Sequence, residues 1–356
     1  MVALSGGVDS AVSLLRLRDR GADVEAIFMK NWEEDDETGY CAAAEDLADA
    51  TAVCRRLGVA LRTVNFSAEY WERVFERFLD GLRLGLTPNP DVACNREVKF
   101  QELLEHAQSL GAAQVATGHY ARIVEHRNRL RLYKGADPDK DQSYFLYTLG
   151  QEALQRCQFP IGELTKPEVR RIAHEAGLAV HAKRDSTGIC FIGERPFSEF
   201  LARYIPETPG AVVDPDGTRL GTHRGLAFYT LGQRRGLGIG GRHAAGDAPW
   251  YVARKDLENN RLIVVQGHSH PLLLSRALCA TELNWVAGEP VRLPARLSAK
   301  IRYRQAEQRC HARPVAADTL RLDFEQPQWA VTPGQSVVLY RGEECLGGGI
   351  IQQAVT

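Results

Sequence analysis

A glycine-containing loop at residues 5–10 constrains the fold of this chain more than any other feature. It lies between a short apolar run and an amphipathic stretch that ends at Gly21. Glycines at a strand-to-helix turn let backbone amides close on an anion, and the helix dipole favours negative charge there. The loop lacks the sequence patterns of Walker and dinucleotide-binding loops. We therefore expect a phosphate-binding loop in which Asp9 helps to hold Mg²⁺ on a pyrophosphate, with an ordinary tight turn as the alternative.

Short apolar runs and helical patterns alternate through the first third of the chain. The expected strands and helices lie, in chain order, at residues 10–20, 24–29, 41–57, 61–66, 68–84, 96–110 and 114–117. A turn at 87–91 presents Cys94 near a helix start, and Thr165 with Glu168 matches a capping box. This order of elements predicts a parallel sheet with helices on both faces, and ligands beyond the carboxyl ends of its strands.

The length of 356 residues exceeds the size at which a single core usually stops growing, so two or three domains are expected. After about residue 205, helical periodicity gives way to strand alternation. Hairpins are expected to join residues 251–253 to 262–265 and residues 337–340 to 345–351. We expect domains at 1–200, 201–275 and 276–356, the last being long enough for a small closed barrel.

Charge, hydropathy and cysteine usage exclude several classes of protein. No apolar stretch approaches the roughly 18 residues that span a bilayer, and no secretory pattern opens the chain, so a cytoplasmic protein is expected. The net charge of −1 confines any RNA-binding surface to a region of the protein. The acidic run at 33–37 should repel RNA and fits a solvated loop or a partner-protein surface. None of the eight cysteines forms a Cys-x-x-Cys pair, which indicates free thiols rather than a zinc or iron–sulfur site.

Segments distributed nearly from end to end carry a resemblance to a known family. They are Phe28–Asp36, Thr87–Asn95, Ala116–Tyr120, Lys140–Tyr147, Asp185–Glu194, Thr230–Arg235 and Ile301–Gln305. With the glycine loop, they resemble the bacterial tRNA-specific 2-thiouridylase family (MnmA/TrmU). The resemblance implies an α/β N-terminal domain with a doubly wound parallel sheet of the adenine nucleotide alpha hydrolase-like (PP-loop) type. A small, mainly-β central domain and a C-terminal β-barrel that contacts tRNA would follow.

The family has a full strand before the loop, whereas only four residues precede Ser5 in this chain. Because strands average five or six residues, we expect the natural start to lie upstream of Met1.

The resemblance implies ATP-dependent 2-thiolation of the wobble uridine (position 34) of tRNA. The C2 oxygen would be adenylated and then replaced by sulfur from a cysteine persulfide, giving 2-thiouridine, AMP and pyrophosphate. ATP with Mg²⁺, a sulfur-relay or cysteine desulfurase protein as sulfur donor, and the tRNAs for Lys, Glu and Gln are the implied cofactors and partners. The implied ATP-binding residues are Ala3, Leu4, Ser5, Gly6, Gly7, Val8, Asp9, Ser10, Met29 and Gly118. The implied tRNA contacts are Asn89, Pro90, Asp91, Lys140, Asp141, Gln142, Arg302 and Tyr303.

Cys94 and Cys190 are the candidate catalytic thiols. Cys94 is expected just before a helix, where the dipole lowers a thiol pKa, and the nearby Asp91 can act as acid or base. Cys190 follows Lys183 and Arg184 in a segment suited to a thiolate or persulfide anion. The resemblance makes Asp91 and Cys94 (the nucleophile) catalytic and Cys190 the persulfide carrier. A disulfide between the two cysteines would release sulfide, or Cys94 would assist direct attack.

The remaining cysteines are expected to be buried core residues. They are Cys41, Cys54, Cys157, Cys279, Cys310 and Cys345.

A basic segment near the C-terminus is the candidate RNA path. Residues 292–313 contain seven Lys or Arg residues and one acid, Glu307. Strand alternation would place Lys300, Arg302 and Arg304 on one face, a row able to neutralise phosphates. A solvated strand face is the alternative.

Two other functions remain open. The first is an adenylating amidotransferase or ligase of the same loop class, which would need no cysteine. The second is a non-catalytic RNA-binding module that only holds nucleotide.

Overall fold

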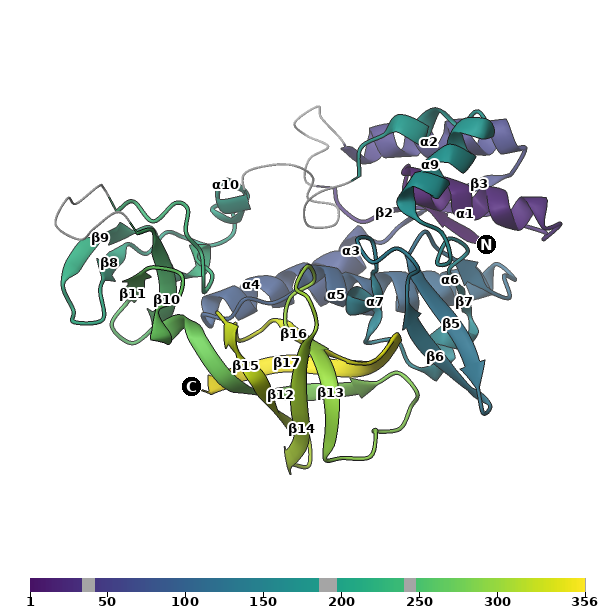
Figure 1. Cartoon of the computed structure of the whole chain (residues 1–356). Coiled ribbons are helices and arrows are strands. Elements are labelled where there is room, and N and C mark those ends of the chain that lie inside the picture. Colours follow the sequence, from purple (N-terminus) through teal and green to yellow (C-terminus); the bar gives the residue numbers. More distant parts are fainter. Residues whose placement is uncertain (34–41, 186–196, 240–247, 356) are drawn as a thin grey trace.

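The computed structural model describes residues 1–33, 42–185, 197–239 and 248–355 (Figure 1). Its first part contains a five-stranded parallel sheet, which confirms the predicted strand arrangement. In spatial order the strands are β3 (Leu61–Asn65), β2 (Ala26–Lys30), β1 (Val2–Leu4), β4 (Val115–Ala116) and β7 (Cys157–Gln158). Strand β1 has three residues and pairs with β2 on one side and β4 on the other. The short strand that leads into the glycine loop is therefore the centre of the sheet.

Helices cover both faces of this sheet, as predicted for a doubly wound fold. One face carries α1 (Val8–Asp19), α2 (Ala42–Leu57) and α9 (Lys166–Glu175). The other face carries two long helices, each containing a π-helical segment. They are formed by α3 (Ser67–Tyr70), η2 (Trp71–Phe75) and α4 (Glu76–Arg83), and by α5 (Pro90–Cys94), η3 (Asn95–Glu102) and α6 (Leu103–Ser109). Side chains on β2 alternate between the two cores, with Ile27 in one and Phe28 in the other.

Shorter helices connect the sheet to the rest of the chain. They are α7 (Ser143–Leu146), α8 (Gln151–Gln155), η4 (Ala179–Ala182) and α10 (Phe197–Leu201). The predicted capping box of α9 is confirmed, because the backbone N–H and the hydroxyl of Thr165 both donate to Glu168 at 2.7 Å. Among the described residues, none of the helices is both long enough and apolar enough to cross a membrane.

The second part of the molecule is a small four-stranded sheet. In spatial order its strands are β10 (Trp250–Asp256), β11 (Arg261–Gln266), β8 (Gly210–Val213) and β9 (Arg219–His223). The predicted hairpin is present, since β10 and β11 are antiparallel and Asn260 in the connection has φ of 48°. Short 3₁₀ turns, η5 (Leu226–Phe228) and η7 (Pro271–Leu273), complete the part of this region that the structure describes.

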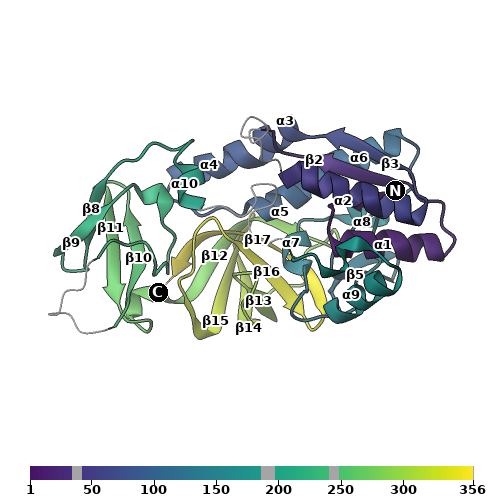
Figure 2. The ribbon, with the colours of Figure 1, turned by 90° about the horizontal axis from the view of Figure 1, so that it is seen from above.

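The third part is a closed six-stranded barrel. Its strands are β12 (Leu274–Trp285), β15 (Thr319–Trp329), β14 (Gln308–Ala316), β13 (Ala295–Lys300), β16 (Ser336–Arg341) and β17 (Glu344–Val355). Pairing of β12 with β17 closes the barrel, and the predicted β16–β17 hairpin is confirmed. Both views place the barrel between the α/β part and the small sheet (Figures 1 and 2).

The α/β part and the barrel share one sheet, a feature that the sequence did not predict. The hairpin of β5 (Ala121–His126) and β6 (Arg129–Lys134) extends the barrel sheet through pairing of β6 with β17. A single hydrophobic core also joins the two parts, because it contains Cys94 together with Tyr340 and Cys345 of the barrel. The α/β part and the barrel are therefore joined both by strand pairing and by a common core.

Candidate functional site

The glycine loop closes on itself at the carboxyl end of β1. Gly6 has φ of +72°, and a Cβ added there would lie 2.5 Å from the carbonyl oxygen of Asp46. The hydroxyl of Ser10 accepts a hydrogen bond from the backbone N–H of Ser5 at 3.2 Å and donates to the carbonyl of Gly7 at 3.1 Å. Because α1 begins at Val8, its first backbone amides have no partner within the helix and remain suited to an anion.

The other residues expected to bind ATP lie on strands next to this loop. Gly118 lies two residues after the end of β4, the strand beside β1, and a Cβ added to it would lie 2.7 Å from the backbone nitrogen of Ser10. Met29 lies on β2, whose residues Ile27 and Phe28 are in register with Ala3 and Leu4 of β1. The structure thus brings the predicted ATP-binding residues together at the carboxyl edge of the sheet.

A network of ion pairs lies beside the loop, and sequence reasoning missed most of it. Both carboxylate oxygens of Asp9 accept from the Lys166 ammonium, at 2.8 and 2.9 Å, and Tyr120 donates its hydroxyl proton to Asp9 at 2.7 Å. Lys166 also lies 2.7 Å from Asp185, whose carboxylate further binds Lys140 at 2.6 Å. Asp9 and Asp185 lie far apart in the sequence, so no local pattern predicts that they meet. The capping box at the start of α9 was the one local signal for the position of Lys166.

These contacts change the expectation for Asp9. Its carboxylate is paired with a cation, and the described residues contain no cluster of three His, Cys, Asp or Glu side chains that could hold a metal ion. The Asp9 carboxylate is therefore already engaged by Lys166 and Tyr120.

Cys94 lies inside a helix rather than just before one, where the sequence pattern placed it. The helix begins at Pro90, because the side chain of Asn89 accepts hydrogen bonds from the backbone amides of Asp91 and Val92 at 3.2 Å. The segment read as a turn is thus an N-cap followed by proline in the first helical turn. Asp91 and Cys94 are three residues apart on one helix, which places them on neighbouring positions of its surface.

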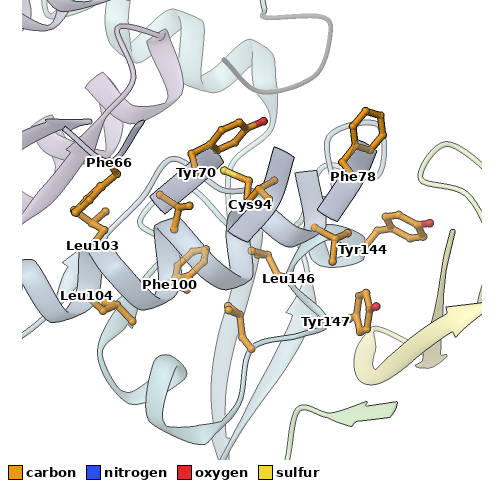
Figure 3. Close-up of a cluster of buried hydrophobic side chains, with 14 of the residues drawn as sticks. Phe66, Tyr70, Phe78, Cys94, Phe100, Leu103, Leu104, Tyr144, Leu146 and Tyr147 are labelled. Carbon is orange, nitrogen blue, oxygen red and sulfur yellow. The ribbon is translucent and has the colours of Figure 1, made fainter. Parts of the chain in front are cut away.

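The expected lowering of the Cys94 pKa is wrong. Cys94 has an exposed fraction of 0% and lies in the core beside Tyr70 (Figure 3). Burial raises the pKa of its thiol to about 11, with Lys99 opposing and Asp91 reinforcing the shift. Desolvation of the thiolate therefore outweighs the helix dipole at this position.

Cys190 lies outside the residues that the structure describes, as does Cys41. Lys183, expected to favour an anion near Cys190, donates instead to the carboxylates of Asp46, at 2.8 Å, and Asp49. The remaining cysteines are buried free thiols, as predicted. They are Cys54, Cys157, Cys279, Cys310 and Cys345.

The residues expected to contact tRNA in the middle of the chain have intramolecular partners. Asp141 is buried, and its carboxylate accepts from the backbone amides of Gly135 and Ser143 at 3.1 Å. The side-chain oxygen of Gln142 accepts from the backbone N–H of Tyr120 at 2.9 Å. Both side chains therefore hold the turn that carries Lys140 against the glycine-loop region.

The expected row of basic side chains on one strand is wrong. Strand β13 ends at Lys300, whose ammonium lies 3.6 Å from Asp141, so Arg302 and Arg304 belong to a turn. Arg302 donates to the carbonyl of Ala330 at 2.8 Å and lies 5.2 Å from the ring centre of Trp329. Sequence alternation cannot reveal these long-range partners.

Tyr303 and Arg304 have different environments. The Tyr303 ring lies 4.4 Å from that of Phe145 and is half-buried, whereas Arg304 is exposed. Of the predicted row, Arg304 is thus the side chain most open to a phosphate.

Three family models match successive parts of the chain. They are a tRNA methyl transferase HUP domain at residues 1–194, a tRNA methyl transferase PRC-barrel domain at 198–266 and an aminomethyltransferase beta-barrel domain at 275–351. The tRNA-specific 2-thiouridylase MnmA of Sodalis glossinidius is 58% identical over 353 residues, covering 99% of this chain and 96% of that protein. The protein of the same name from Alkalilimnicola ehrlichii is 59% identical, with the same coverage of 99% and 96%.

Two solved structures with similarity to the chain are more distant than these relatives. The U34-tRNA thiolase NcsA from Methanococcus maripaludis aligns with a TM-score of 0.36 and 17% identity, covering 58% of this chain and 65% of that one. A 4-thiouridine synthetase in complex with RNA and ATP aligns with a TM-score of 0.33 and 19% identity, covering 58% and 50%.

Proposed function

Because the chain belongs to the tRNA-specific 2-thiouridylase family, we propose that it replaces the C2 oxygen of the wobble uridine of tRNA by sulfur in an ATP-dependent reaction. The chain is accordingly a tRNA sulfurtransferase. The observation that carries the proposal is the likeness to a curated 2-thiouridylase over 99% of the chain. The closed, anion-suited loop at β1 supports the use of ATP.

In the proposed first step, ATP binds at the loop and next to Met29 and Gly118. The wobble uridine leaves its base stack, since its C2 carbon is shielded there. Its C2 oxygen attacks the α-phosphorus, pyrophosphate leaves, and the oxygen becomes part of a good leaving group. Mg²⁺ would be held mainly by the phosphates of ATP, with Asp9 as a candidate protein ligand, and would supply positive charge that neutralises the departing pyrophosphate.

In the proposed second step, sulfur from a persulfide on Cys190 bonds to C2, and AMP departs with the oxygen. The sulfur–sulfur bond of the persulfide breaks when the Cys94 thiolate forms a disulfide with Cys190. Disulfide formation either precedes attack and releases hydrosulfide, or follows direct attack of the persulfide on C2. An external thiol then reduces the disulfide, and Asp91 is the proposed acceptor of the Cys94 proton.

The tRNA contacts are also part of the proposal. We assign the target base to the neighbourhood of Asn89, Pro90 and Asp91, and the tRNA backbone to the Lys140–Gln142 turn and the Arg302–Tyr303 turn. Asp141 and Arg302 would act by holding these turns in shape, since both have close partners within the chain.

The partners and the setting remain predictions. They include a sulfur-relay or cysteine desulfurase donor, the tRNAs for Lys, Glu and Gln, a cytoplasmic location, and domain boundaries near residues 200 and 275.

Mass analysis of nucleosides tests the function. The protein is incubated with unmodified tRNA, ATP and a persulfide donor, and 2-thiouridine is measured after digestion of the tRNA. Cys94→Ser and Cys190→Ser should abolish the product, whereas Cys54→Ser, a buried cysteine elsewhere, should retain it. Full product from Cys190→Ser would overturn the sulfur route.

The same assay separates the alternatives. Amide formation by a double alanine variant of the two cysteines would support a ligase. A lack of tRNA-dependent pyrophosphate release would support a binding module.

A further inference from the structure

Three cationic side chains converge on the carboxylate of Asp185. The ammonium of Lys140 lies 2.6 Å from one oxygen, and the other oxygen lies 2.7 Å from Lys166 and 2.9 Å from Arg170. Counting Asp9 and Asp137, which both contact Lys166, three cations meet three carboxylates, so displacement of Asp185 leaves one excess positive charge. Converging Lys and Arg side chains of this kind are the arrangement that binds phosphate groups in proteins.

The cluster is held next to the glycine loop. Lys166 is bonded to both oxygens of Asp9 in the first turn of α1, and its ammonium lies 5.9 Å from the ring centre of Tyr120. The backbone N–H of Lys166 donates to Asp137 at 2.8 Å, which fixes the start of α9. A polyphosphate whose one end lies at the loop amides would therefore extend toward Lys166.

Solvent has access to the centre of the cluster. The side chain of Lys166 has an exposed fraction of 10%, whereas Lys140 and Arg170 have fractions of 35% and 33%. Asp185 itself is 32% exposed, so a dissolved anion can compete for its partners.

We propose that Lys140, Lys166 and Arg170 form a second phosphate subsite beside the glycine loop, and that Asp185 occupies it as an internal competing anion. The subsite takes the β- and γ-phosphates of a nucleoside triphosphate, or the pyrophosphate released from it. Ligand phosphates take over the hydrogen bonds of Lys166 and Arg170, while Asp185 gives them up. The assignment to ATP rests on the proposed function, but binding of the phosphates does not require tRNA.

Calorimetric titration of the full chain with inorganic tripolyphosphate tests the subsite, in magnesium-free buffer without tRNA. Asp185→Asn removes the competing charge and should bind tripolyphosphate at least fivefold more tightly than the wild type, because the three cations remain. Lys166→Met should bind at least tenfold more weakly, and Lys166→Arg should retain most of the affinity. AMP, which lacks the outer phosphates, should respond little to any of these changes.

Arg171→Gln is the matched control. Arg171 lies on the same helix α9, carries the same charge, and pairs with Glu175 at 2.9 Å outside the cluster. Its loss should leave tripolyphosphate binding unchanged. An equal loss in Arg171→Gln and Lys166→Met would reduce the effect to general charge and overturn the subsite.

The gain in Asp185→Asn decides the proposal even if Lys166→Met does not fold, since a misfolded protein does not bind more tightly. Equal or weaker tripolyphosphate binding by Asp185→Asn would overturn the role of Asp185. These outcomes are independent of thiolation. A protein that makes 2-thiouridine but shows no effect of Asp185 or Lys166 would refute the subsite alone, whereas the reverse result would refute only the proposed function.

Discussion

The buried thiol of Cys94 should react as an acid far weaker than an ordinary cysteine. Its pKa is raised by burial from 9.0 to about 11, a hundredfold change in acid dissociation that corresponds to about 2.7 kcal/mol. At pH 8, about one thiol in a thousand is ionised, compared with about one in ten for a thiol of pKa 9. Because the thiolate is the reacting form, alkylation of Cys94 should accelerate about tenfold per pH unit between pH 7 and pH 10.

Iodoacetamide labelling, followed by proteolysis and mass analysis of the Cys94 peptide, measures this dependence. The reagent is kept dilute, so that the rate stays proportional to its concentration and local opening is not limiting. Asp91→Asn should speed labelling because its carboxylate raises the thiol pKa, and Lys99→Met should slow it because its ammonium lowers that pKa. Arg96→Gln, an exposed cation on the same helix, serves as control.

A plateau of the labelling rate below pH 9 would refute the argument from burial. So would slower labelling in Asp91→Asn than in the wild type. If the predicted pH dependence holds, Cys94 reacts at neutral pH only by losing its proton to a neighbouring base during attack.

Four further predictions concern other contacts of the site. Gly118→Ala should weaken ATP binding at least tenfold in calorimetry, because its Cβ would lie 2.7 Å from the backbone nitrogen of Ser10. Arg302→Gln should lower the free energy of unfolding by about 1–2 kcal/mol, because packing and hydrogen bonding are lost. Arg304→Gln should reduce by about one the slope of the logarithm of tRNA affinity against the logarithm of salt concentration, because one phosphate contact is lost. Partial burial alone would raise the pKa of Asp185, but hydrogen bonds from lysines hold it at about 2. Its stabilising contribution is therefore complete above about pH 4 and lost toward pH 2, so the Tm difference between Asp185→Asn and the wild type should shrink over that range.

Local patterns predicted the parallel sheet and its loop because their causes are local. Strand-to-helix alternation, glycines at the turn and the capping box at Thr165 all act within a few residues. The Asn89–Pro90 pair is also a local signal for a helix start, but the proline-rich composition of residues 87–91 is equally typical of a turn. A helix that begins at Pro90 places Cys94 inside it.

Long-range pairing explains the parts that the sequence did not predict. Lys300 pairs with Asp141, and Arg302 donates a hydrogen bond to Ala330. Both partners are too distant in the sequence for a local pattern to predict. Likewise, the pKa of Cys94 depends on burial beneath residues from distant elements. Charge counts along the chain therefore overestimate how much positive charge is free to meet RNA.

The pairing of β6 with β17 determines when this protein can finish folding during synthesis. Glu344 and Cys345 of the last strand pair with Tyr133 and Leu132, and Cys345 lies in the same core as Cys94. A nascent chain that has emerged only to residue 200 exposes the edge of β6 and an unfilled core, both of which favour aggregation. The α/β part can therefore complete its core only after the last strand has been synthesised. Expressed without the barrel, it should give insoluble protein.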